Sequence, residues 1–246
     1  MDINYKKFKV IVREGYESIC AVVAEIIAGQ IATQPDSVLG LATGSTPLGV
    51  YKKLVGTDFS RVTCFNLDEY HPIERTNHQS YHYFMMQNLF NRVNINPDNI
   101  NIPSGEAVDF AAECDAYEEK IAASGGIDLQ LLGIGPCGHV GFNEPAAIFP
   151  KQTHYVALDS STIEANSRFF ESTDKVPKHA ITMGVGTIFS ARHILLMATG
   201  SHKADIVEKV VLGDIDPQVS GSILQLHPNV TLAMDAAAAV KLLQSL

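Results

Sequence analysis

The chain has 246 residues, of which 46% are hydrophobic and 18% charged, so it is too apolar to be a disordered protein. Its formal net charge of −9 argues against a nucleic-acid partner, because a phosphate backbone needs a basic surface. A small anionic substrate stays possible, since a few cations and backbone N–H groups can form a local positive site.

The compartment is predicted to be the cytoplasm. Residues 1–13 are polar and charged and lack the apolar core of a signal peptide, and no stretch is expected to cross a membrane. The cysteines form no Cys-x-x-Cys pair, which argues against zinc or thioredoxin chemistry. Three of them, Cys20, Cys64 and Cys114, lie in apolar patterns and are expected to be small core residues.

Short apolar runs alternate with segments of helical periodicity along the chain. The predicted strands are 37–43, 61–67, 127–134, 180–183, 193–199 and 229–234. The predicted helices are 19–27, 47–54, 79–89, 110–121, 203–211 and 236–243. This alternation predicts an α/β fold with a mainly parallel sheet flanked by helices on both faces, in a single domain covering 1–246. Open sheets of this kind bind ligands at the carboxyl ends of their strands.

A glycine-containing loop follows the first predicted strand and opens a helix. Its residues are Thr43, Gly44, Ser45, Thr46 and Pro47. Glycine permits a tight turn, and free N–H groups at a helix start can bind an anion such as a phosphate. The alternative is a capping turn without a ligand. The loop matches neither a dinucleotide-binding fingerprint nor a Walker loop, so neither a dinucleotide nor ATP is implied.

Two adjacent carboxylates, Asp68 and Glu69, follow the second strand. One of them could be a general base, or Asp68 could simply cap the following loop. After the strand ending at residue 134, a glycine-rich segment contains His139, and Glu144 follows five residues later. Histidine moves protons near neutral pH, and a carboxylate can orient its ring; the alternative is a structural histidine in a glycine-rich turn.

Two cations are candidates for phosphate contacts. Arg168 lies in Ala-Asn-Ser-Arg-Phe-Phe, and Lys203 follows a predicted strand and a glycine. Either could instead be a solvated surface residue. Together the segments fit a phosphorylated small molecule that undergoes proton transfer. The sequence predicts no metal site and no cofactor.

The combination of these segments resembles the glucosamine-6-phosphate deaminase family. The matching segments are Thr-Gly-Ser-Thr-Pro (43–47), Asn-Leu-Asp-Glu-Tyr (66–70), Gly-His (138–139), Gly-Phe-Asn-Glu-Pro (141–145), Asn-Ser-Arg-Phe-Phe (166–170) and Ser-Ile-Leu-Gln-Leu-His-Pro (222–228). They occur in order between residues 37 and 235. The resemblance implies a Rossmann-like sheet and the cofactor-free conversion of glucosamine 6-phosphate and water to fructose 6-phosphate and ammonia.

Residue roles are implied by the same resemblance. Asp68 would move the C2 proton to C1, and His139, oriented by Glu144, would open the pyranose ring. The residues that would hold the phosphate are Thr43, Gly44, Ser45, Thr46, Arg168 and Lys203.

Two departures from the family pattern stand out. Cys137 occupies a position where many members carry an Asp, and residues 146–154 do not match the effector-binding stretch of allosterically regulated members. The resemblance therefore implies an unregulated enzyme, monomeric or in a small homo-oligomer. The alternatives are a galactosamine-6-phosphate deaminase, a 6-phosphogluconolactonase and a non-catalytic sugar-phosphate sensor.

Overall fold

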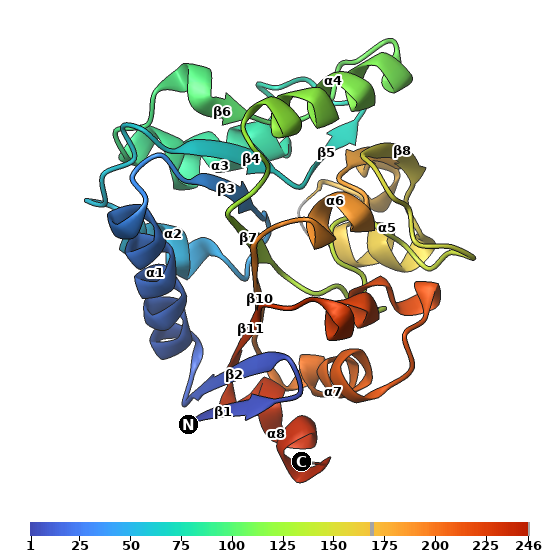
Figure 1. Cartoon of the computed structure of the whole chain (residues 1–246). Helices are drawn as coiled ribbons and strands as arrows, with labels where there is room; N and C mark the ends of the chain where they lie inside the picture. Colours follow the sequence, from blue (N-terminus) through green and yellow to red (C-terminus); the bar gives the residue numbers. More distant parts are fainter. Residues whose placement is uncertain (168–169, 246) are drawn as a thin grey trace.

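A long twisted sheet runs through the middle of the molecule (Figure 1), whose computed structural model describes residues 1–167 and 170–245. Within these ranges the sheet has eight strands in the order β1 (Asp2–Tyr5), β2 (Phe8–Arg13), β11 (Val230–Asp235), β10 (His193–Ala198), β7 (Leu129–Leu132), β3 (Val38–Leu41), β4 (Thr63–Asn66) and β6 (Ile100–Asn101). All neighbours pair in parallel except β1 and β2, which form an antiparallel hairpin. The predicted mainly parallel α/β sheet is confirmed.

Helices cover both faces of this sheet. One face packs against α1 (Tyr16–Thr33), α2 (Leu48–Leu54) and α3 (Tyr81–Asn88). The other face packs against α4 (Phe110–Ala123), α6 (Val185–Phe189), α7 (Ala204–Leu212) and α8 (Ala236–Ser245). In Figure 1, α1 and α2 in blue lie on the opposite side of the central strands from α7 in orange. The central strands are buried on both sides, which explains why their sequences are continuously apolar.

A small antiparallel sheet lies beyond the carboxyl ends of the main strands. It contains β5 (Asp68–His71), β9 (His179–Thr182) and β8 (His154–Ala157), and α5 (Ser160–Ser167) follows β8. Leu67 links the two sheets, because its N–H bonds to Leu41 in the main sheet and its carbonyl accepts from Met183. The strand predicted at 180–183 therefore exists but belongs to this second sheet. Asp68 was expected in a loop and instead begins a strand.

The helix α1 corrects one expectation from the sequence. It is long and apolar enough to cross a membrane by length and composition, although no such segment was expected. One face of the helix, including Ile19, Val23 and Ile27, is buried against the main sheet. This packing is typical of a core helix in an α/β fold. Cys20, Cys64 and Cys114 are buried, as predicted.

Candidate active site

The candidate site is a pocket of about 410 Å³ at the carboxyl edge of the main sheet. The chain moves outward from β3 to β4 and β6, returns to β7 beside β3, and then proceeds outward through β10 and β11. The loops that follow β3 and β7 therefore diverge, which leaves a crevice where ligands bind in folds of this kind. Segments following β3, β4, β7 and β10 all line this pocket.

One wall of the pocket carries the residues predicted to contact phosphate. Thr43, Gly44, Ser45 and Thr46 line it from the loop after β3. We call residues 43–46 the anion loop. Gly44 has φ of +91°, a conformation that other residues rarely adopt. The following helix α2 has only 7 residues, so the loop itself supplies the polar groups, rather than the dipole of a long helix.

Lys203 lies on the same pocket, at the end of the 3-10 turn Ser201–Lys203 that follows β10. Its Nζ donates to the carbonyl oxygen of Ile134 at 2.7 Å, which ties the loop after β10 to the end of β7. The ammonium group is thus held at the pocket by a neighbouring strand end. A cation near the anion loop favours an anionic ligand.

Asp68 and Glu69 are adjacent in sequence, but their side chains have different surroundings. Glu69 accepts hydrogen bonds from the N–H groups of Tyr70, Tyr81 and His82, at 2.8 to 2.9 Å, and so fixes the start of α3. Asp68 lines the pocket and is only 6% exposed. Burial, with a smaller effect of the Glu69 charge, raises the pKa of Asp68 to about 8. A carboxylate with this pKa is a stronger base than an exposed aspartate.

His139 and Glu144 form a buried pair at the pocket. Nδ1 of His139 lies 3.1 Å from Oε2 of Glu144, within ion-pair distance, and among the described residues neither atom has a partner at full hydrogen-bond geometry. Burial would raise the pKa of Glu144, but contacts with His139, Thr162 and the N–H of Asp159 outweigh it and lower this pKa. An ionised Glu144 can hold the imidazole in one orientation.

The position of the His139 ring depends on a glycine. A Cβ atom at Gly135 would lie 2.0 Å from Nε2 of His139, so only glycine leaves room for the ring. His139 lines the pocket, whereas Glu144 lies behind it and reaches the pocket through the histidine. The pair can therefore give or accept a proton at a bound ligand.

The pocket thus brings together nearly all of the residues singled out in the sequence. Arg168 lies outside the described residues. Tyr81 and Thr162 also line the pocket and were missed. Tyr81 was hidden inside an ordinary helical pattern at 79–89, and Thr162 lies on α5, which carries no apolar periodicity that would have indicated a helix.

Comparisons with known proteins place the chain among sugar-phosphate enzymes. Residues 13–230 match the family described as glucosamine-6-phosphate isomerases/6-phosphogluconolactonase. The chain belongs to this family. A glucosamine-6-phosphate deaminase of Clostridioides difficile (strain 630) is 53% identical over 240 residues, which cover 95% of this chain and 96% of that protein.

Solved structures agree with this membership. A monomeric glucosamine-6-phosphate deaminase superposes with a TM-score of 0.92 at 42% identity, covering 94% of this chain and 99% of that one. A 6-phosphogluconolactonase from Leishmania guyanensis has a TM-score of 0.74 at 21% identity, covering 94% and 97%, and shares the fold. The resemblance drawn from the sequence motifs is confirmed at the level of the family and the Rossmann-like fold.

Cys137, where the sequence departs from the family pattern, lies beside the start of α5. Its Sγ lies 3.5 Å from Oγ of Ser161, in the first turn of α5. Ser161 in turn donates to the Asp159 carboxylate at 2.6 Å, and the N–H of Asp159 donates to Glu144 at 3.3 Å. The start of α5 therefore contacts both Cys137 and Glu144.

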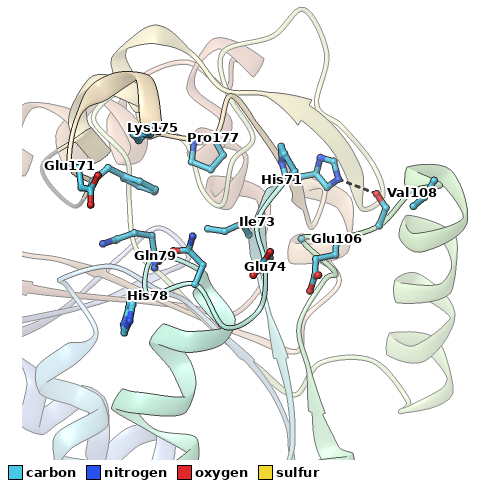
Figure 2. Close-up of a pocket in the computed structure, with 15 residues that line it drawn as sticks. His71, Ile73, Glu74, His78, Gln79, Glu106, Val108, Glu171, Lys175 and Pro177 are labelled. Atoms are coloured by element: carbon cyan, nitrogen blue, oxygen red, sulfur yellow. Dashed lines mark hydrogen bonds between the residues drawn. The ribbon is translucent and has the colours of Figure 1, made fainter.

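A second hollow, of about 900 Å³, is larger than the candidate site, and Figure 2 shows the residues that line it. The charged side chains at its rim, Glu74, Glu106, Glu171 and Lys175, are all exposed. His71 also lines this hollow, and its Nε2 lies 3.0 Å from the carbonyl oxygen of Ala107. Because it contains neither Asp68 nor the His139–Glu144 pair, size alone does not make it the candidate active site.

Proposed function

We propose that the protein catalyses the isomerising deamination of glucosamine 6-phosphate, with water, to fructose 6-phosphate and ammonia. One observation carries the proposal. A buried carboxylate of raised pKa, Asp68, and the His139–Glu144 pair open onto the same pocket as the anion loop and Lys203. The reaction needs both kinds of group, because it combines proton transfers on a sugar with recognition of its phosphate.

The proton transfers divide between the acid–base groups. His139 gives a proton to the ring oxygen and takes up the proton that the C1 hydroxyl loses, which opens the pyranose to the aldehyde. Asp68, in its ionised form, then removes the proton from C2 and delivers it to C1. A proton moves from the amino nitrogen to the C1 oxygen, so that the C1 carbonyl becomes an alcohol and C2 becomes an imine. Water adds to this imine, and ammonia leaves as the C2 ketone forms. No cofactor is required for any of these steps.

The phosphate contacts provide position and binding energy. The N–H and hydroxyl groups of the anion loop and the ammonium group of Lys203 would hold the phosphate, with Arg168 as a further contact. Binding energy from a group remote from the reacting carbons fixes C1 and C2 against Asp68. A phosphate bound at this wall would also give Lys203 a role at the pocket of a protein whose net charge is negative.

The rival functions differ in what they require. A lactonase adds water to an ester and needs no base at C2, so the buried Asp68 favours the deaminase. A sensor needs the phosphate contacts but neither Asp68 nor His139. A galactosamine-6-phosphate deaminase would use the same groups and differ only at the C4 hydroxyl.

An ammonia-release assay with glucosamine 6-phosphate and galactosamine 6-phosphate tests the proposal. We expect release from the first substrate, and a higher kcat/KM for the second would move the assignment to its C4 epimer. Absence of ammonia from both, in a folded protein, would refute a deaminase. Asp68→Asn should abolish exchange of the C2 proton with solvent while phosphate binding persists.

We also infer the setting in which the enzyme works. The chain acts as a single catalytic domain over 1–246, on a free sugar phosphate, in the cytoplasm and without nucleic acid or membrane as partner. The likeness to a monomeric deaminase supports a monomer, with a small homo-oligomer as the alternative.

A further inference from the structure

A tyrosine outside the pocket holds the anion loop in place. Tyr16 is the first residue of α1, and its hydroxyl lies 3.1 Å from the carbonyl oxygens of both Ser45 and Thr46. The same oxygen accepts the N–H of Gly49 at 2.8 Å. One hydroxyl therefore ties together α1, two peptide units of the loop and the first turn of α2. Tyr16 itself is not part of the pocket wall.

These hydrogen bonds orient the carbonyl and N–H groups of the anion loop. In a trans peptide the carbonyl oxygen and the following N–H point in opposite directions. The Ser45 carbonyl faces Tyr16, so the N–H of Thr46 is turned away from α1. The Tyr16 hydroxyl also satisfies the N–H of Gly49, one of the helix-start groups that lack a partner within the helix. The two carbonyl oxygens share the single proton of the hydroxyl, so its removal would deprive both of their hydrogen bond to Tyr16.

The close approach of the two helices is built around this contact. A Cβ atom at Gly49 would lie 2.6 Å from Sγ of Cys20 and 3.0 Å from Cε1 of Tyr16. Only glycine at this position lets α2 approach Tyr16 closely enough for the hydrogen bond. Burial raises the pKa of the Tyr16 hydroxyl, so it stays protonated and able to donate at neutral pH.

We infer that Tyr16 is a positioning residue for the substrate phosphate, acting through the carbonyl groups of Ser45 and Thr46. The inference rests on the proposed function, in which the anion loop binds that phosphate. Its distinguishing consequence is an effect on phosphate affinity and KM, with the chemical step left intact. A residue that only stabilised the fold would not change phosphate affinity in the folded protein.

The test compares the full-length protein with Tyr16→Phe and Tyr155→Phe. The matched control also loses a hydroxyl, one that contacts His71 at 3.4 Å outside the candidate pocket. Calorimetric titration with inorganic phosphate should show a Kd raised roughly three- to tenfold by Tyr16→Phe, the effect of losing one or two ordinary hydrogen bonds. KM for glucosamine 6-phosphate should rise by a similar factor, while kcat changes less than about twofold. Tyr155→Phe should match the wild type in each measurement.

The outcomes separate this inference from the proposed function. If wild-type protein releases ammonia but Tyr16→Phe keeps its phosphate Kd and its KM, the inference is wrong and the function stands. If no ammonia is released, the function fails, and the phosphate titration still decides the role of Tyr16. A fall in kcat at unchanged KM would also overturn the inference. Should Tyr16→Phe fail to fold, Gly49→Ala displaces the same hydroxyl from the other side and should raise the same Kd.

Discussion

At the scale of single residues, the site depends on two neighbouring carboxylates, of which one binds backbone N–H groups and the other lines the pocket. Glu69 is fully engaged with backbone N–H groups of β5 and α3, whereas Asp68 is buried at the pocket. Strand alternation separates them, because successive side chains of β5 point to opposite faces. The sequence shows that a carboxylate pair follows a strand, and the structure shows which member reaches the ligand side.

The raised pKa of Asp68 leads to a testable pH dependence of stability. The folded protein keeps this proton up to about pH 8, whereas an unperturbed aspartate releases it near 3.8. Between about pH 4 and 8, Asp68 is ionised in the unfolded chain but protonated in the folded protein. The free energy of unfolding therefore falls as the pH rises over this range. Asp68→Asn cannot ionise, so its stability relative to wild type should increase over this range and level off above it.

Two measurements check this expectation. Urea unfolding of both proteins between pH 4 and 9 gives the stability difference, and carboxyl ¹³C NMR should show a titration near pH 8 that disappears in Asp68→Asn. Glu69, whose pKa burial raises to about 7, provides a second signal that should persist in the variant. A stability difference that does not vary with pH would contradict the assignment.

At the scale of elements, the predictable strands are those buried on both faces. The core strands β3, β7, β10 and β11 are apolar runs, and all were predicted. The strands β5 and β8, with sequences Asp-Glu-Tyr-His and His-Tyr-Val-Ala, carry no such signal. They are strands because they pair with β9, a partner over 20 residues away in the chain, and local sequence cannot report that pairing.

The hairpin of β1 and β2 was missed for a different reason. Residues 1–13 were described only as polar and charged, and no strand was predicted there, yet Phe8, Val10 and Val12 alternate toward the core. The candidate site was predicted more completely, because parallel strands place their ends at one edge whatever the order of the strands. Tyr81 and Thr162 reach that edge from α3 and α5, so strand ends alone could not reveal them.

A prediction at this scale concerns the loop that carries Lys203. The Asp235 carboxylate accepts the N–H of Gly200 through both oxygens, at 2.9 and 3.1 Å, and the N–H of Ala238 at the start of α8 at 2.8 Å. Asp235→Ala should lower the free energy of unfolding by about 1–2 kcal/mol, as for loss of a helix cap and a hydrogen bond. It should also raise KM, because the loop before Lys203 loses its anchor.

Asp109→Ala is the matched control for this prediction. Asp109 caps α4 by accepting the N–H of Ala112 at 3.0 Å and does not line the pocket. Urea unfolding should show destabilisation in both variants, and steady-state kinetics should show a raised KM in Asp235→Ala alone. Equal KM values in the two variants would mean that the hydrogen bonds between Gly200 and Asp235 do not position Lys203.

At the scale of the whole molecule, the fold concentrates polar chemistry at one edge of an otherwise apolar sheet. The loops that follow β3 and β7 diverge there, and the small sheet of β5, β9 and β8 lies beyond that edge. All groups proposed to act on substrate therefore come from one chain. The proposed monomer rests on the likeness to a monomeric deaminase.

This arrangement predicts simple kinetics. Homotropic cooperativity requires coupling between at least two sites, so a monomer with one active site should give a hyperbolic dependence of rate on glucosamine 6-phosphate. N-acetylglucosamine 6-phosphate should not activate it, because residues 146–154 lack the pattern of regulated family members. Sedimentation velocity at the assay concentration establishes the oligomeric state in parallel with the rate curve. A sigmoidal curve that becomes hyperbolic with N-acetylglucosamine 6-phosphate would show that subunits communicate and that residues outside this stretch bind the effector.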